Sequence, residues 1–69
     1  MKRSELEKRI RRAAKQVGVE CEFYELTHHR GVRVGKTATT IPRHAEIPDL
    51  LAETIFKQLQ PELGERWWR

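Results

Sequence analysis

Residues 29–41 read HRGVRVGKTATTI, and the rest of the predicted fold can be worked out from this stretch. Apolar and polar side chains alternate toward the end of residues 29–34, which is the pattern of a half-buried strand. Residues 37–41 have the composition of a second strand. A Gly-Lys pair at 35–36 separates the two segments and is typical of a turn. The stretch therefore predicts a β-hairpin.

A further strand and a helix precede this hairpin. Alternation of apolar and polar residues through 19–24 predicts the strand. Residues 4–17 predict a helix, because their apolar side chains recur at helical spacing. These side chains are Leu6, Ile10, Ala13, Ala14 and Val17. Ser4 and Glu7 form a capping-box pattern that would begin the helix, and Gly18 would end it.

A second helix follows the hairpin. Pro42 ends the last strand, and after a loop Pro48 suits the first position of a helix, which needs no N–H donor. The apolar stripe of this helix contains Leu51, Ile55, Phe56 and Leu59. Pro61 closes it, because proline cannot continue a helix. The predicted order is thus helix, three strands, helix.

This order predicts how the elements pack. An amphipathic helix has to bury its apolar stripe, and a three-stranded sheet has a face to cover. Laying both helices on one face of an antiparallel meander satisfies both requirements and leaves the other face to solvent or a partner. We therefore expect a single α+β domain over residues 1–69, with the α-β-β-β-α layout of double-stranded-RNA-binding domains.

Length and composition exclude several classes of protein. A chain of 69 residues has no room for a second domain, a dinucleotide-binding half or a deep small-molecule cavity. The single cysteine, Cys21, excludes an intrachain disulfide and a cysteine-based zinc cluster. The longest apolar run is only three residues, so neither a membrane-spanning helix nor a secretory signal is expected. These observations favour a cytoplasmic protein.

Positive charge is concentrated in the middle of the chain. The net charge is +4, yet no acidic residue lies between Glu25 and Glu46. That window contains all three histidines together with four bases, namely Arg30, Arg33, Lys36 and Arg43. Such a patch attracts polyanions, and nucleic acid is the commonest polyanion in the cytoplasm. The Lys/Arg-rich face of the first helix is interpreted as solvated surface, with RNA contact as the alternative.

The alternation of residues 29–34 places the side chains that could take part in catalysis on one face of the strand. Val32 and Val34 point to the core, so His29, Gly31 and Arg33 point the other way. Gly31 would leave a gap in which a backbone phosphate meets both the imidazole and the guanidinium. An imidazole can move the proton of a 2′-hydroxyl or a leaving 5′-oxygen, and a guanidinium can stabilise the charged phosphorane without a metal. His29 is therefore the candidate general acid/base of RNA cleavage.

Simpler interpretations of these residues stay open. A histidine on an exposed strand is most often a surface residue without catalytic function. Neighbouring side chains on a strand diverge, so His28 and His29 do not make a metal pair, and neither a metal site nor a cofactor is expected. Cys21 is interpreted as a core residue. Trp67 and Trp68 are expected to pack on the core, with stacking on a base as the alternative.

Residues 40–44 read Thr-Ile-Pro-Arg-His, the opening residues 1–6 read MKRSEL, and residues 62–69 end the chain with ELGERWWR. These segments resemble the HicA-type mRNA interferase toxins of bacterial toxin–antitoxin operons, which have a Val/Ile-Pro-Arg-His element, and the likeness covers essentially the whole chain. Counting back from that element without gaps places His29 on the catalytic histidine of the family. A shift of one residue would place His28 there instead.

The resemblance implies a double-stranded-RNA-binding-like fold and an endonuclease that cleaves mRNA and is silenced by a HicB-type antitoxin. Thr27 and Gly31 depart from the family pattern, which has a glycine and an apolar residue there. The toxin alone is expected to be monomeric. The residues expected to hold the RNA are His28, Arg30, Arg33, Lys36, Arg43 and His44. A non-catalytic RNA-binding module, or a protein-interaction domain with an acidic partner, would use the same patch.

Overall fold

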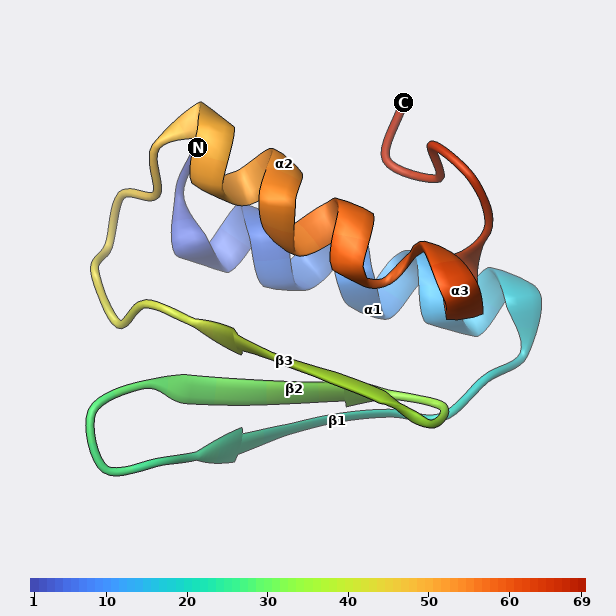
Figure 1. Cartoon of the computed structure of the whole chain (residues 1–69), viewed down its shortest axis with the longest axis horizontal. Helices are drawn as coiled ribbons and strands as arrows, with labels where there is room; N and C mark the ends of the chain where they lie inside the picture. Colours follow the sequence, from blue (N-terminus) through green and yellow to red (C-terminus); the bar gives the residue numbers. More distant parts are fainter.

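Three antiparallel strands form one sheet in the order β1-β2-β3. In the computed structural model, which describes residues 1–69, the strands are β1 (Cys21–Glu25), β2 (Arg30–Val34) and β3 (Thr37–Ile41). The helices are α1 (Arg3–Val17), α2 (Asp49–Gln58) and the one-turn α3 (Gln60–Leu63). Both long helices lie on one face of the sheet, and the other face is uncovered (Figure 1). The predicted α+β class, element order and one-sided packing are confirmed.

The hydrophobic core lies between the sheet and the two long helices. Leu6, Ile10 and Ala14 of α1 meet Val32 and Val34 of β2, and each is at most 1% exposed. The remaining members of the core are Ile41, Ile47, Ala52, Ile55, Phe56, Leu59 and Leu63. Burying a side chain of the size of leucine stabilises a fold by about 1.5–3 kcal/mol, so these few residues are the main source of stability in so short a chain.

Two residues of the predicted apolar stripes are exposed to solvent. Val17 is 51% exposed because it is the last residue of α1, where Gly18 adopts a left-handed conformation (φ 77°) and turns the chain toward β1. Leu51 is 38% exposed, and the neighbouring Ala52 is buried in its place. The helical stripe of α2 is therefore rotated by one residue at its start relative to the prediction.

The predicted capping box at Ser4 and Glu7 is wrong. The N-cap of α1 is Lys2, and no side chain caps the helix. The amide of Arg3 instead donates to the carbonyl of Ala45 (2.9 Å), beside an isolated bridge between Lys2 and Glu46. A backbone acceptor from the β3–α2 loop, residues 42–48, thus replaces the serine hydroxyl. The same contact ties that loop to the start of α1.

The C-terminal residues fold back over α2. Pro61 lies at the start of α3 and does not end the helical region, although α2 itself ends before it as predicted. The indole N–H of Trp67 donates to the carbonyl of Phe56 (2.8 Å), and the two rings meet edge to face at 4.9 Å. Trp68 stacks on Phe56 at 5.9 Å. The prediction that the tryptophans pack on the core is confirmed.

The sheet ends in two free edges, because β1 and β3 each pair with β2 only. The turn between β2 and β3 has Gly35 at φ 59°, a conformation that favours glycine, so the predicted Gly-Lys turn is confirmed. β3 has the sequence TATTI and contains no charged residue. No helix of the structure is long and apolar enough to cross a membrane.

Candidate functional site

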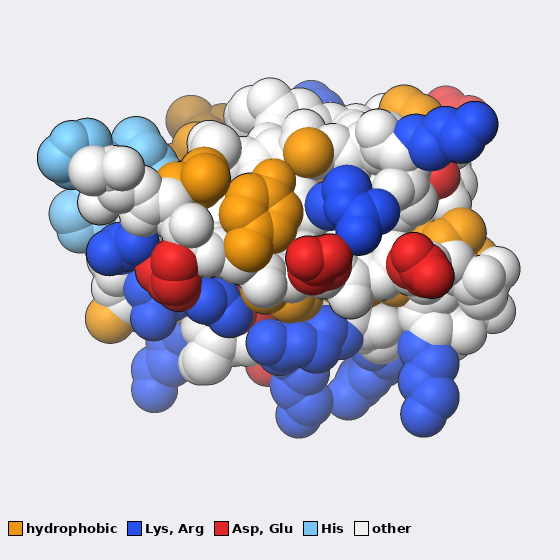
Figure 2. All heavy atoms as spheres, turned by 90° about the horizontal axis from the view of Figure 1, so that it is seen from below, with side chains coloured by type: hydrophobic (Ala, Val, Ile, Leu, Met, Phe, Trp, Pro, Cys, Tyr) orange, Lys and Arg blue, Asp and Glu red, His pale blue; other side chains and the backbone are white.

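Two loops leave the sheet at the same end. Arg30 at the start of β2 pairs with Ile41 at the end of β3, so the β1–β2 loop (residues 26–29) and the β3–α2 loop begin side by side. The first loop contains His28 and His29, and the second contains His44. All three imidazoles are exposed and gather at one end of the molecule, shown in pale blue in Figure 2. We refer to these three residues as the histidine cluster.

Arg43 connects the two loops. Its guanidinium donates to the carbonyl of Leu26 and, at 3.4 Å, to the carbonyl of His29. It also forms an ion pair with Glu25 (2.7 Å) at the end of β1. The Arg43 side chain keeps 45% of its surface exposed. The backbone beside His29 is thus fixed by a group that is still accessible to solvent.

A chain of ion pairs continues from Arg43 into the interior. Arg30 forms ion pairs with Glu25 of β1 (2.5 Å) and with Glu7 of α1 (2.8 Å). These hydrogen bonds, to Glu25 above all, raise the pKa of the Arg30 guanidinium. The Glu7 side chain is only 9% exposed, and Arg3 and Arg11 approach it at 3.8 and 3.7 Å. We call Glu7, Arg30, Glu25 and Arg43 the ion-pair network.

The ion-pair network explains why the Glu7 carboxylate can be buried between α1 and the sheet. A buried charge is costly unless opposite charges and hydrogen bonds compensate it. Three arginines surround Glu7, and the guanidiniums of Arg11 and Arg30 in turn lie over the Phe23 ring, at 4.4 and 5.3 Å. Arg30, which is expected from the sequence to hold RNA, points to the helix side of the sheet and is committed to this network.

The open face of the sheet lacks the predicted phosphate gap. Tyr24 lies opposite Gly31 in the strand register, and its ring covers the glycine so closely that a side chain there would overlap it. His29 precedes β2 and is not part of its alternation. The proposed arrangement of His29, Gly31 and Arg33 around a phosphate is therefore wrong. Only glycine leaves room for the Tyr24 ring at position 31, and the ring in turn shields the exposed backbone of Gly31 from solvent.

The remaining predicted bases are separated from the histidine cluster. Arg33 lies on the open face and binds Glu22 (2.9 Å) and the carbonyl of Gly35 (3.1 Å). The hydrogen bond to Glu22 raises the pKa of Arg33. Lys36 lies in the β2–β3 turn, at the opposite end of a five-residue strand, or roughly 16 Å away. The structure therefore brings together His28, His29, Arg30, Arg43 and His44, but neither Arg33 nor Lys36.

Uncompensated positive charge lies on α1, where the sequence interpretation assigned plain solvated surface. Lys8, Arg12 and Lys15 are exposed and have no acidic partner, whereas Arg9 and Arg11 pair with Glu5 (3.5 Å) and Glu7. Lys and Arg side chains accordingly line the lower margin of Figure 2, the side on which α1 lies. Helical spacing alone indicates which of these bases lack an acid four residues away.

Neither the single cysteine nor a metal-binding cluster adds a reactive group to this site. Cys21 is half-buried against the core, and burial raises the pKa of its thiol. Its interpretation as a core residue is confirmed. No group of three His, Cys, Asp or Glu side chains is arranged to hold a metal ion.

No family model, no curated protein and no solved structure matches this chain.

Proposed function

We propose that this protein is a metal-independent endoribonuclease of the HicA-type mRNA interferase class, with the double-stranded-RNA-binding-like version of its α+β fold. The observation that carries the proposal is the histidine cluster, in which three exposed imidazoles meet at one end of the molecule beside the half-exposed guanidinium of Arg43. Imidazoles exchange protons at neutral pH, and a guanidinium binds phosphate oxygens in a planar fork.

The proposed reaction is transfer of the RNA phosphate to the neighbouring 2′-hydroxyl. His29 accepts the 2′-hydroxyl proton while the 2′-oxygen attacks phosphorus, and the bond from phosphorus to the 5′-oxygen breaks. The imidazolium formed on His29 then gives this proton to the leaving 5′-oxygen, so the products are a cyclic phosphate and a 5′-hydroxyl. Arg43 stabilises the added negative charge on the phosphorane oxygens.

The other predicted site residues take different parts in this proposal. His28 and His44 flank the scissile phosphate, and Arg33 and Lys36 contact the RNA backbone farther from it. Arg30 positions Arg43 through Glu25 because its guanidinium is held on the helix side of the sheet. The proposed setting is the cytoplasm, with mRNA as substrate, a HicB-type antitoxin as inhibitor and a monomeric toxin in its absence.

A non-catalytic RNA-binding module is the second candidate. The free bases of α1 favour it, because they supply attraction for RNA that does not depend on the histidine cluster. In that case salt-sensitive binding is the whole activity, and the imidazoles are ordinary surface groups.

Cleavage of a long RNA in EDTA distinguishes the two candidates. Purified wild-type protein is compared with His29→Ala and with His28→Ala, which removes a matched exposed imidazole one residue away. We expect loss of cleavage in His29→Ala by about 10²-fold or more, with a cyclic phosphate on the wild-type products. Loss in His28→Ala alone would shift the catalytic role by one residue. Binding without cleavage by the wild type would establish the RNA-binding module.

A further inference from the structure

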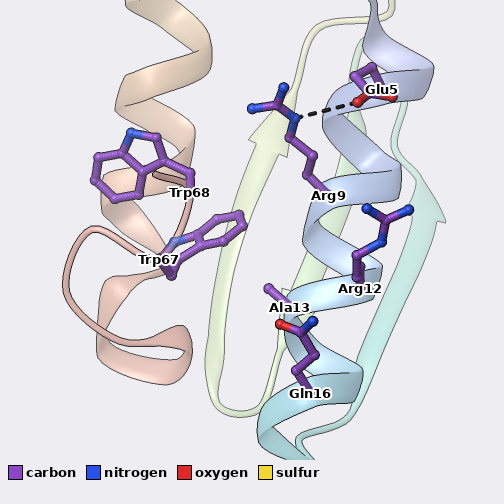
Figure 3. A pocket seen from close by; sticks show the side chains of 7 residues that line it. All are labelled: Glu5, Arg9, Arg12, Ala13, Gln16, Trp67 and Trp68. Atoms are coloured by element: carbon purple, nitrogen blue, oxygen red, sulfur yellow. Dashed lines mark hydrogen bonds and ion pairs between the residues drawn. The ribbon is translucent and has the colours of Figure 1, made fainter.

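A groove separates α1 from the C-terminal segment, on the side of the molecule away from the open sheet face. Its volume is about 290 Å³, and Figure 3 shows the side chains that line it. Trp67 and Trp68 form one wall, and α1 forms the other with Arg9 and Arg12. Glu5, Ala13 and Gln16 complete the lining. The groove is therefore lined by aromatic side chains on one side and by two arginine side chains on the other.

The wall of tryptophans is held rigidly. The Trp67 ring is fixed by its hydrogen bond to the Phe56 carbonyl, and it meets Trp68 edge to face at 6.0 Å. Trp68 in turn stacks on Phe56. Both indoles are only half-buried, so each keeps ring surface accessible. A rigid aromatic surface loses little conformational entropy when a planar ligand stacks on it.

The opposite wall has a net positive charge. Arg9 shares its charge with Glu5, the one carboxylate in the groove, at 3.5 Å. Arg12 has no acidic partner and is exposed. A ligand here meets one free guanidinium and one that is already neutralised. This pattern suits a planar ring joined to an anionic group.

We propose that this groove binds one nucleotide of single-stranded RNA, with its base stacked on the Trp68 indole and its phosphate on Arg12. Stacking on aromatic side chains combined with arginine contacts is the general way in which proteins hold unpaired nucleotides. The choice of RNA as ligand rests on the proposed function. The volume lies at the low end of small-molecule sites, which suits one nucleotide and not an extended drug-like ligand.

In this proposal a single RNA strand runs from the histidine cluster along α1 to the groove. α1 begins beside the cluster, where the Arg3 guanidinium donates to the carbonyl of Arg43 (2.6 Å). Arg12 follows Arg3 by nine positions, which corresponds to about 14 Å along the helix axis and about half a turn around it. Lys8 lies between them on the same helix. The groove thus holds the strand a few nucleotides away from the scissile phosphate.

Intrinsic fluorescence reports on this groove directly, because Trp67 and Trp68 are the only tryptophans in the chain. The wild-type protein is titrated with a hexa-adenylate whose 2′-hydroxyls are methylated, so that no 2′-oxygen attack can consume it. We expect saturable quenching. Arg12→Gln should weaken binding by about fivefold, whereas Lys15→Gln, which removes the same charge outside the groove, should weaken it less than about twofold.

The stacking partner is tested with two substitutions at one position. Trp68→Ala should weaken binding of the fluorescein-labelled oligonucleotide by about tenfold, and Trp68→Phe by clearly less, because a smaller ring still stacks. Thermal melting identifies any variant that fails to fold. If Trp68→Ala does so, the comparison of Arg12→Gln with Lys15→Gln decides by itself.

Three outcomes would overturn the inference. The first is absence of quenching, and the second is an equal effect of Arg12→Gln and Lys15→Gln. The third is equal quenching by a polyglutamate peptide, which would identify an acidic protein segment as the ligand. Cleavage of natural RNA without quenching would refute the groove and leave the nuclease standing. Quenching without cleavage would refute the nuclease and leave the groove standing.

Discussion

The molecule has two basic regions, and they differ in what surrounds their charges. The loop patch consists of Arg30, Arg33, Lys36 and Arg43. The α1 face consists of Lys8, Arg12 and Lys15. In the loop patch, every arginine forms an ion pair with a glutamate from another element, whereas the α1 face has no acidic partner. The arginines of the region that is free of acids in sequence are therefore the ones that have acidic partners in space, whereas Lys36 has none.

This difference separates two uses of the same residue types. Arginine in the loop patch fixes backbone, because Arg43 and Arg30 hold the ends of strands and loops through shared carboxylates. Bases of the α1 face stay fully hydrated and keep their counterions, which an RNA strand releases when it binds. Substitutions in the first region should change stability and loop order, and substitutions in the second should change attraction for polyanions.

The largest expected effect is on the buried end of the ion-pair network. Glu7→Gln removes the carboxylate that balances the charge of Arg30 between α1 and the sheet. We therefore expect a loss of about 2–3 kcal/mol in the free energy of unfolding. For a chain of this size that corresponds to a fall in melting temperature of about 10 °C or more. Glu5→Gln breaks only an exposed pair within α1 and should cost at most about 0.5 kcal/mol. Equal melting curves for the two variants would contradict the structural role of Glu7.

A smaller effect is expected where the network reaches the surface. Arg43→Ala removes the bonds to the Leu26 and His29 carbonyls, and it should cost about 1 kcal/mol of stability. The more specific result is faster amide hydrogen exchange in residues 26–29, with the core amides unchanged. Arg43→Lys keeps the charge but cannot bridge both carbonyls and Glu25 in the same fork, so it should also loosen the loop. Unchanged exchange in both variants would rule out Arg43 as the connection.

Sequence patterns predicted the elements of this fold well, because periodicity depends on which face of each element is buried. The helices, the strands and the packed tryptophans follow from that single requirement. Periodicity does not predict which distant residue will form a hydrogen bond with a given polar group. Ser4 does not cap the helix, because the amide of Arg3 donates to the carbonyl of Ala45, which lies 42 residues after Arg3 in the sequence.

The candidate site was predicted only in part, because its geometry also depends on contacts between distant residues. His28, His29, Arg43 and His44 were found as residues but not as a cluster, because their proximity depends on how the two loops leave the sheet. The register that pairs Glu25 with Arg30 also brings Glu22 to Arg33 and Tyr24 to Gly31. If the length of the β1–β2 loop had been predicted, this register would have followed from it. The register in turn predicts the ion pairs of Arg30 and Arg33 and the contact of Tyr24 with Gly31.

The third prediction concerns RNA affinity and its salt dependence. Lys8→Gln removes a free charge of the α1 face, so the slope of log K against log salt for a single-stranded oligonucleotide should shrink by about 0.7. Arg33→Gln removes a charge that Glu22 compensates in the free protein, so the slope should shrink by clearly less. Anisotropy titrations at several salt concentrations measure both. A larger change in Arg33→Gln than in Lys8→Gln would reverse the comparison of the two regions.

The smallest effect is expected from releasing a paired base. Glu22→Gln frees the Arg33 guanidinium on the open sheet face, and RNA binding should tighten by about twofold at low salt. Glu65→Gln, at an exposed position without a basic partner, gives the same change in net charge and serves as the control. An equal gain in both variants would show that only total charge matters.

The uncharged edge strand β3 has a consequence for the behaviour of the protein in concentrated solution. An unpaired strand edge is a template on which another chain can add a strand, and TATTI has the β-branched composition that favours such growth. Its two flanks oppose this, because Lys36 adds charge at one end and Pro42 has no N–H to continue the ladder at the other. Lys36 and Pro42, which take no part in the core, thus oppose the addition of a foreign strand at this edge.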